Sequence, residues 1–204
     1  GRRGHAPSPG LVDPLASAPG LCMAAVTQPK LSAVPRGTPF GDEIPAAHRR
    51  GVTVGGTSAG ASIQSSHMVA FGSGGATPKQ RMTQVAAGLG LLEGCVIDQH
   101  FEQRNRYGRL LMIVSQSPQL LGMGVDEDTA AIISRVGATQ VLRVAGRGAV
   151  TLVDGPHMPT HAHEAPEHRP TLAAGVRPHL RPARAGSDLA TAARPYGPRA
   201  VDRP

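Results

Sequence analysis

The sequence contains no tryptophan, two tyrosines and three phenylalanines. So few aromatic side chains offer little surface on which nucleic-acid bases could stack, and the chain carries no zinc-finger, RNP or helix-turn-helix signature. We therefore expect no nucleic-acid partner, although the formal net charge is +7. Much of that excess charge lies in arginines near the C-terminus, a pattern typical of a solvated basic tail.

Cysteine and long apolar runs are also scarce. The two cysteines, Cys22 and Cys95, have neither the spacing of a metal site nor that of a disulfide framework, so free thiols in a reducing, cytoplasmic compartment are expected. No apolar run approaches the roughly 18–20 residues that a membrane-spanning helix needs, so no membrane partner is expected. Prolines soon after the basic N-terminus argue against a secretory signal.

The 26 glycines and 19 prolines are unevenly distributed and divide the chain into three regions. Residues 1–35 match no motif well, and their composition is compatible with disorder. Residues 36–155 have the patterns of an α/β catalytic region. Residues 156–204 are rich in proline, arginine and histidine and form a degenerate C-terminal segment. Proline cannot donate to a β-ladder, so we expect any strand around residues 176–182 to be compromised.

Helical and extended patterns alternate within residues 36–155. This alternation predicts an α/β fold with a mostly parallel sheet flanked by helices. Helices are expected over residues 38–49, 59–68 and 102–115, with a short helix and a turn over 80–92. A flexible loop is expected at residues 70–79. Strands are expected over residues 52–54, 95–97, 120–125, 130–134, 139–144 and 149–153.

Residues 56–60 read Gly-Thr-Ser-Ala-Gly, the G-x-S-x-G pattern of a nucleophile elbow, and they follow a short apolar run. In such an elbow the serine lies on a sharp turn between a strand and a helix, where small neighbours leave room for unusual backbone dihedrals. The first N–H groups of the following helix then face any anion that forms beside the serine. Ser58 is therefore a candidate nucleophile.

Two further groups of chemically active residues follow predicted strands, at residues 98–100 and 126–128. Ligands of open α/β sheets bind at the carboxyl ends of the strands, so we expect these residues and Ser58 to lie at one edge. A serine nucleophile needs a base within hydrogen-bond reach and a group that orients the base. His100 and Glu127 are candidates for these two roles.

Three segments together resemble one known family. These are the elbow, residues 98–110 (Asp-Gln-His-Phe-Glu-Gln-Arg-Asn-Arg-Tyr-Gly-Arg-Leu) and residues 122–130 (Gly-Met-Gly-Val-Asp-Glu-Asp-Thr-Ala). They resemble the cyanophycinases, serine peptidases related to the aspartyl dipeptidase called peptidase E. That family degrades cyanophycin, a polyaspartate backbone carrying arginine on each β-carboxyl group, to β-Asp-Arg dipeptides.

The resemblance implies a serine-type exopeptidase that acts through an acyl-enzyme, with no metal and no organic cofactor. It implies that Ser58 is the nucleophile, His100 the general base and later acid, and Glu127 the carboxylate that orients His100. The N–H of Ala59 would be an oxyanion-hole donor. The positions that match the family's substrate-binding residues are Gln28, Asp98, Gln99, Arg104, Arg106 and Arg109. The family also suggests a homodimer.

Alternatives remain open at this point. Family members usually carry additional residues before this region, so the first βα units of the sheet are expected to be missing. The chain could be a peptidase E-like dipeptidase acting on small aspartyl or β-aspartyl peptides. It could also be a non-catalytic, truncated remnant that binds polyanions.

A group of histidines could suggest a metal site, but their spacing fits neither a strand nor a helix, so none is expected. These are His157, His161, His163 and His168.

Overall fold

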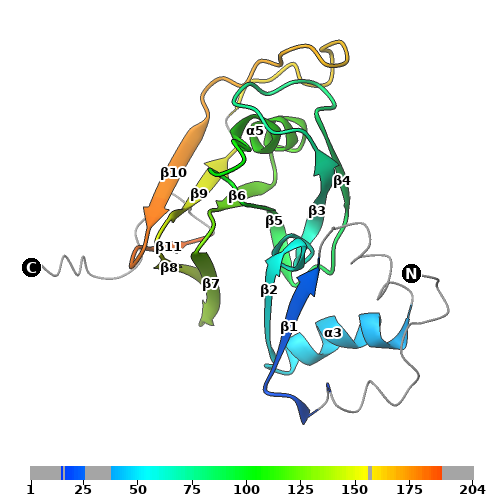
Figure 1. The fold of residues 1–204 in the computed structure, drawn as a ribbon, viewed down its shortest axis with the longest axis vertical. Helices are drawn as coiled ribbons and strands as arrows, with labels where there is room; N and C mark the ends of the chain where they lie inside the picture. Colours follow the sequence, from blue (N-terminus) through cyan, green and yellow to red (C-terminus); the bar gives the residue numbers. More distant parts are fainter. Residues whose placement is uncertain (1–14, 16, 26–37, 156–157, 190–204) are drawn as a thin grey trace, which may run out of the picture.

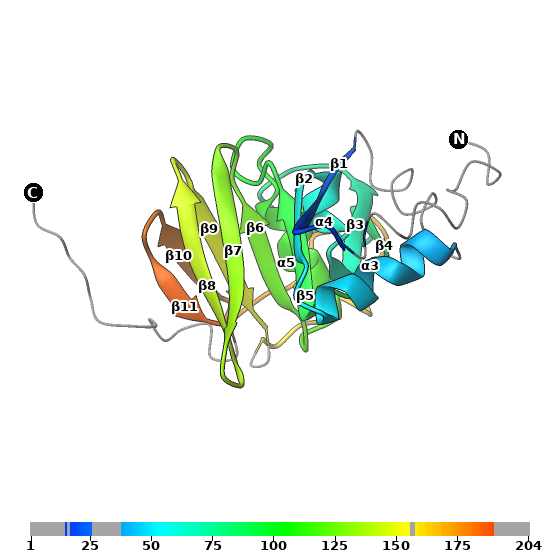
Figure 2. The same ribbon diagram turned by 90° about the horizontal axis from the view of Figure 1, so that it is seen from below.

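The structure is a computed structural model that describes residues 15, 17–25, 38–155 and 158–189. Its strands form three sheets (Figures 1 and 2). The first sheet pairs β1 (Gly20–Ala25) with β2 (Thr53–Ser58) in parallel. The helix α3 (Pro39–Arg49) lies beside this pair in both views. No helix among the described residues is long and apolar enough to cross a membrane.

The second sheet has six strands in the order β10-β9-β6-β5-β3-β4. The bounds are β3 Ser65–Gly72, β4 Thr83–Ala87, β5 Leu92–Gln99, β6 Leu121–Val125, β9 Ala149–Asp154 and β10 Arg177–Pro182. The central strands β3, β5 and β6 are parallel, whereas β4, β9 and β10 pair antiparallel with their neighbours. The expectation of a mostly parallel sheet is therefore met only at the centre of a mixed α/β fold.

The third sheet is antiparallel, with the order β11-β8-β7. Its strands are β7 Thr129–Val136, β8 Thr139–Gly146 and β11 Gly186–Asp188. Leu142 and Val144 of β8 pack with Val150 and Leu152 of β9 in a buried cluster. This apolar layer joins the third sheet to the six-stranded sheet.

Helix α5 (Tyr107–Gln116) packs against strands of the six-stranded sheet, where Leu110 and Val114 contact buried side chains such as Val96. Gly122 on β6 permits this packing, because a Cβ at that position would lie 2.9 Å from Val114 and 3.1 Å from Leu110. Helix α5 is the crossover between the parallel strands β5 and β6, a connection that parallel pairing requires. The predicted helix at residues 102–115 therefore exists, although it begins five residues later.

The predicted helix at residues 38–49 is confirmed as α3, capped by Thr38, whose hydroxyl accepts the Gly41 N–H at 3.1 Å. The predicted helix at residues 59–68 is wrong. Helix α4 (Ala59–Ser62) is one turn long and β3 follows it. Ser65 Oγ lies 2.8 Å from the Ser62 carbonyl oxygen and 2.9 Å from the His67 carbonyl oxygen, and its single hydrogen can be donated to either. Such side-chain bonds offer the backbone an alternative to continuing the helix.

Two other segments also differ from the expectation. Residues 83–87 form strand β4 in place of the short helix expected within 80–92, and the expected loop at 70–79 begins only after β3 ends at Gly72. Strand β10 forms in spite of its two prolines, so the expectation of a compromised strand is wrong there. Since β10 is an edge strand, the nitrogens on one side need no ladder partner, and Pro178 and Pro182, four positions apart, share one side.

Candidate functional site

Ser58 lies at the junction of β2 and α4 with φ 54° and ψ −121°, a backbone conformation that a non-glycine residue adopts only under strain. Two glycines make the turn possible. A Cβ at Gly56 would lie 2.1 Å from the Gly60 carbonyl oxygen, and a Cβ at Gly60 would lie 2.0 Å from the Met23 carbonyl oxygen on β1. The backbone therefore has the sharp strand-to-helix turn of a nucleophile elbow.

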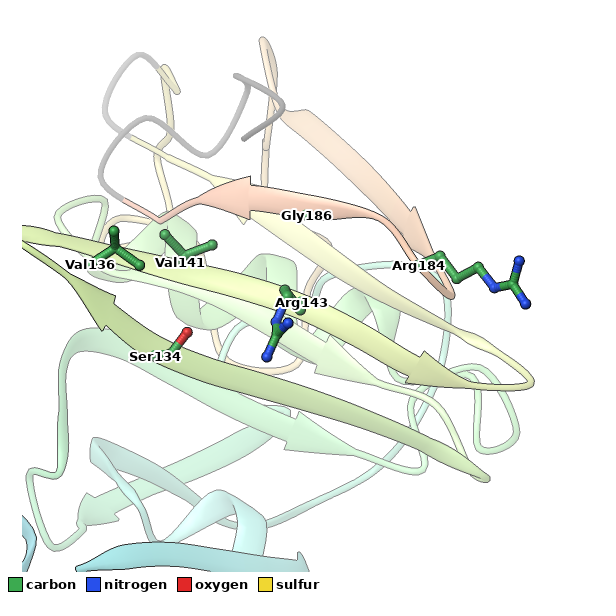
Figure 3. Close-up of a pocket in the computed structure, with 6 residues that line it drawn as sticks. All are labelled: Ser134, Val136, Val141, Arg143, Arg184 and Gly186. Atoms are coloured by element: carbon green, nitrogen blue, oxygen red, sulfur yellow. The ribbon is translucent and has the colours of Figure 1, made fainter. Parts of the chain in front are cut away.

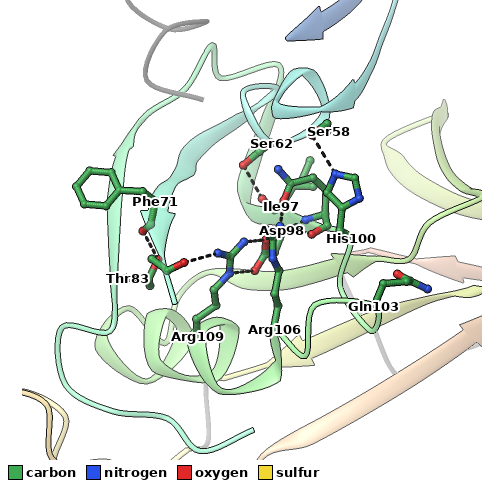
Figure 4. Close-up of polar contacts among 12 residues, drawn as sticks. Ser58, Ser62, Phe71, Thr83, Ile97, Asp98, His100, Gln103, Arg106 and Arg109 are labelled. Atoms are coloured by element: carbon green, nitrogen blue, oxygen red, sulfur yellow. Dashed lines mark hydrogen bonds and ion pairs between the residues drawn. The ribbon is translucent and has the colours of Figure 1, made fainter. Parts of the chain in front are cut away.

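The three residues expected to act together are linked by two hydrogen-bond contacts through His100. Ser58 Oγ is 3.0 Å from His100 Nε2, and His100 Nδ1 is 2.7 Å from Glu127 Oε1. Ser58 is the last residue of β2, and His100 and Glu127 follow the ends of β5 and β6. Figure 4 shows the contact between Ser58 and His100. A serine, an imidazole and a carboxylate in this order can move a proton away from the serine hydroxyl.

Backbone contacts fix the turn that carries His100. His100 itself has φ 50°, and the Phe101 N–H donates to the Val125 carbonyl of β6 at 3.2 Å. The Phe101 ring is fully buried and lies directly on Gly124, where a Cβ would be 2.4 Å from the ring. The absence of a side chain at Gly124 therefore lets the turn after β5 pack against β6.

Ala59 is the first residue of α4 and is completely buried. Its N–H belongs to the first helical turn, whose N–H groups have no partner within the helix. The role of the Ala59 N–H as an oxyanion-hole donor stays a prediction. Gln28, the other residue expected in this part of the site, lies outside the described residues.

A buried ion cluster lies beneath His100 (Figure 4). The Asp98 carboxylate is 0% exposed and accepts a forked pair of bonds from Arg109, with Nε to Oδ2 at 2.6 Å and Nη2 to Oδ1. Arg109 also donates to the Gly72 carbonyl at 3.2 Å. The Asp98–Arg109 pair thus anchors the end of β5, two residues before His100, to α5 and β3.

Arg106 joins the same cluster from a different direction. Its Nη1 donates to the carbonyl and side-chain oxygens of Gln99 and lies 3.4 Å from Asp98 Oδ1. Burial of the guanidinium lowers the pKa of Arg106 to about 10, and the neighbouring Asp98 carboxylate acts in the opposite direction. The group remains charged at neutral pH. Two guanidinium groups therefore share one carboxylate.

The structure separates the five expected substrate-binding residues that it describes by environment. Asp98 and Arg109 are buried and hold each other, whereas Arg104 is exposed at the turn after β5. Gln99 and Arg106 are buried too, at 6% and 9% exposed, and they lie directly before and shortly after His100 in the chain. The binding role of these residues stays a prediction, and their charged groups are not equally open to a ligand.

Sequence reasoning missed several polar residues that support this site. Asp126 was included in the acidic group at residues 126–128 but was given no role, yet it is 7% exposed and accepts two backbone N–H groups. Gln103 and Thr129 bind the backbone of Glu127. The fully buried Ser62 hydroxyl joins α4 to β5 by donating to the Ile97 carbonyl at 2.7 Å. Nothing in the sequence pattern distinguishes these residues from ordinary surface polar residues.

The described histidines of the group in residues 157–168, His161, His163 and His168, form no metal-binding cluster. His161 Nδ1 accepts the Leu172 N–H at 3.0 Å, and His157 lies outside the described residues. In the described part of the chain, no three histidine, cysteine, aspartate or glutamate side chains are grouped so as to hold a metal ion.

A separate cavity of about 390 Å³ lies on the three-stranded sheet (Figure 3). It shares no residue with the Ser58 site. Its lining residues are Ser134, Val136, Val141, Arg143, Arg184 and Gly186.

Comparison with known proteins identifies relatives of this chain. The model of peptidase family S51 matches residues 29–141. The cyanophycinase of Trichormus variabilis is 42% identical over 146 residues, which are 71% of this chain and 48% of the relative. The cyanophycinase of Geminocystis herdmanii is 46% identical over 107 residues, 52% of this chain and 38% of the relative. That of Synechococcus elongatus is 38% identical over 155 residues, 76% of this chain and 47% of the relative.

The chain therefore spans about half the length of the curated relatives it matches. Among solved structures, a peptidase from an acI-B1 Actinobacterium superposes with a TM-score of 0.58 at 22% identity. The match covers 87% of this chain and 66% of that structure. At this level of identity the likeness concerns the fold.

Proposed function

This chain belongs to peptidase family S51, and we propose that it is a serine-type exopeptidase that hydrolyses cyanophycin, multi-L-arginyl-poly-L-aspartate, to β-Asp-Arg dipeptides. The observation that carries the proposal is the series of contacts from Ser58 Oγ to His100 Nε2 at 3.0 Å and from His100 Nδ1 to Glu127 Oε1 at 2.7 Å. The similarity to cyanophycinases supports the choice of substrate.

In the proposed reaction Ser58 Oγ attacks the carbonyl carbon of a backbone amide while His100 Nε2 accepts the hydroxyl proton. Glu127 keeps the proton of the imidazole on Nδ1 and stabilises the imidazolium that forms. The Ala59 N–H donates to the oxyanion of the tetrahedral intermediate. His100 then gives its proton to the leaving amine as the C–N bond breaks, and water hydrolyses the acyl-enzyme by the same steps in reverse order.

The charges around the site suit a substrate that carries many carboxylates. Arg106 shares the Asp98 carboxylate with Arg109, so this buried cluster carries one more positive than negative charge. Arg104 adds an exposed guanidinium on the same turn. A guanidinium binds a carboxylate through two parallel hydrogen bonds, so we assign Arg104 and Arg106 to substrate binding. Gln99 joins them in this assignment by its match to the family's substrate-binding position. In this proposal Asp98 and Arg109 do not contact the substrate, and they hold the end of β5 and the turn that follows it in place.

The proposal extends to compartment and assembly. Cys22 is exposed and Cys95 is buried, and both are free, as suits a reducing cytoplasm. Burial raises the pKa of the Cys95 thiol to about 11, so this thiol stays protonated and unreactive at neutral pH. The homodimer suggested by the family stays a prediction, which sedimentation of the purified chain tests.

A comparison of substrates separates the proposed polymer hydrolase from a peptidase E-like dipeptidase. We expect kcat/KM for the release of β-Asp-Arg from cyanophycin to exceed that for small aspartyl dipeptides, because the exposed Arg104 on the turn after β5 binds a carboxylate of a neighbouring repeat. A higher kcat/KM for aspartyl dipeptides would identify small peptides, and not the polymer, as the substrate. Binding of cyanophycin without the release of dipeptide would identify a non-catalytic polyanion-binding protein.

A further inference from the structure

We propose that Gln103 and Asp126 are positioning residues. They hold the His100 ring and the Glu127 carboxylate in the geometry that proton transfer needs. The inference rests on the proposed function, because the residues that they position are His100 and Glu127. It concerns two turns at the same edge of the sheet. The His100 turn comprises residues 100–106 after β5, and the Glu127 turn comprises residues 126–128 after β6.

The two turns hold each other reciprocally. The Glu102 N–H of the His100 turn donates to Asp126 Oδ1 of the Glu127 turn at 3.1 Å. In the opposite direction, the Glu127 N–H donates to Gln103 Oε1 at 2.9 Å. Each turn thus supplies one side-chain acceptor and one backbone donor to the other. A shift of one turn along the sheet edge would break both bonds.

The second oxygen of Asp126 ties this pair of turns to the sheet. Oδ2 accepts the Ala149 N–H at the start of β9 at 3.0 Å, and the side chain is almost fully buried. Gly148 makes the space, because a Cβ there would lie 2.8 Å from the Asp126 Cβ. Hydrogen bonds from N–H groups to an ionised carboxylate are stronger than those between neutral groups. Asp126 faces backbone donors and so acts on the reaction only through its neighbours.

Glu127 needs this support because its own side chain is 48% exposed and has little packing to restrain it. Its backbone is fixed on both sides. Gln103 accepts its N–H, and the Thr129 hydroxyl donates to its carbonyl at 3.0 Å while accepting the Gly148 N–H at 3.0 Å. Fixing the backbone limits where the Glu127 carboxylate can lie relative to His100 Nδ1. A misplacement of about 1 Å at such a contact can cost about 10²-fold in rate.

The first test replaces Gln103 by leucine, which has a similar size and accepts no hydrogen bond. Gln103 is exposed, so the variant should fold. We expect Gln103→Leu to lower kcat on cyanophycin about tenfold, the equivalent of one net hydrogen bond, with KM within about twofold of the parental value. The matched control is Gln119→Leu, the same change at an exposed glutamine that precedes β6, at the opposite end of that strand from the site. The control should keep the parental kcat.

A rescue separates positioning from general stability. Gln103→Glu keeps a side-chain oxygen that can accept the Glu127 N–H, so its kcat should lie well above that of Gln103→Leu. Asp126→Asn loses an acceptor for one of two backbone N–H groups, and its kcat should fall at least as far as that of Gln103→Leu. A Gln103→Leu variant that changes KM alone would show that Gln103 contacts the substrate, and this result would overturn the proposal.

A second readout needs no substrate. In spectra of protein with ¹⁵N-labelled histidine, assigned with His100→Gln, the His100 ring should be held as the Nδ1–H tautomer in the parental chain and in Gln119→Leu. Gln103→Leu should show exchange between tautomers. If the parental chain fails to release β-Asp-Arg, the proposed function is wrong, and these spectra still decide the positioning role. Identical ring spectra in Gln103→Leu and the parental chain would overturn it.

Discussion

Ser58 and His100 lie 3.0 Å apart, Oγ to Nε2, and both have positive φ, at 54° and 50°. Residues other than glycine seldom adopt such dihedrals, and they persist where the surrounding structure enforces them. Here the ends of β2 and β5, two strands of different sheets, hold the two residues so that their side chains meet. The strain is therefore located at the contact that the proposed chemistry uses.

The close approach of the elbow to β1 predicts a strong effect of a single methyl group. Gly60→Ala places a Cβ 2.0 Å from the Met23 carbonyl oxygen, so the backbone must shift. We expect a loss of about 1–3 kcal/mol in the free energy of unfolding, measured by urea denaturation. Gly55→Ala is the control, since a Cβ there meets nothing within 4 Å. Equal stabilities of the two variants would contradict the packing described for the elbow.

The buried Asp98–Arg109 pair predicts a second large effect on stability. Arg109→Met leaves the Asp98 carboxylate, which is 0% exposed, without its forked partner. Removal of one partner of a buried pair typically costs about 3–5 kcal/mol in the free energy of unfolding. Arg147→Met serves as the comparison. It breaks a 3.9 Å pair with Asp128 whose side chains are 89% and 75% exposed, and such pairs contribute about 0–1 kcal/mol. Similar losses in both variants would rule out an anchoring role for Arg109.

Glu127 is expected to contribute less to the rate than the two residues that exchange the proton with the substrate. Glu127→Gln retains an oxygen that can accept the Nδ1–H of His100, although the charge that stabilises the imidazolium is lost. We predict a smaller fall in kcat for Glu127→Gln than for Ser58→Ala or His100→Ala. Steady-state kinetics on cyanophycin test the order of the three variants. A loss in Glu127→Gln as large as that in Ser58→Ala would assign Glu127 a more direct part in the reaction.

The sequence predicts the parts of this fold whose signals are local. The alternation of apolar residues locates β6 to β9, and the Thr-Pro start with its acidic first turn locates α3. The small residues after Ser58 were read as a long helix, but Ser62 and Ser65 bond to nearby backbone, and the chain continues as a strand. Strand β10 depends on its position at a sheet edge, which the local sequence does not specify.

The candidate site also combines features that the local sequence predicts with contacts that only the fold creates. A glycine-rich turn and two polar groups after strands make Ser58, His100 and Glu127 candidates, and the resemblance to the cyanophycinases supplies the role predicted for each. The burial of Asp98 and Arg109 against each other depends on the distance between β5 and α5, so the sequence suggested that both bind substrate. The bonds of Asp126 to Glu102 and Ala149 likewise join segments that are distant along the chain. Their role becomes visible only in the folded protein.

The central claim is that Ser58 is a nucleophile in this chain. The most direct measurement is the release of β-Asp-Arg from purified cyanophycin by the parental chain and by Ser58→Ala at matched concentration. Circular dichroism and urea denaturation establish that both are folded. The account predicts release by the parental chain, and none above background by Ser58→Ala, which should still bind the polymer. Equal release by both folded proteins, or none by the parental chain, would contradict it.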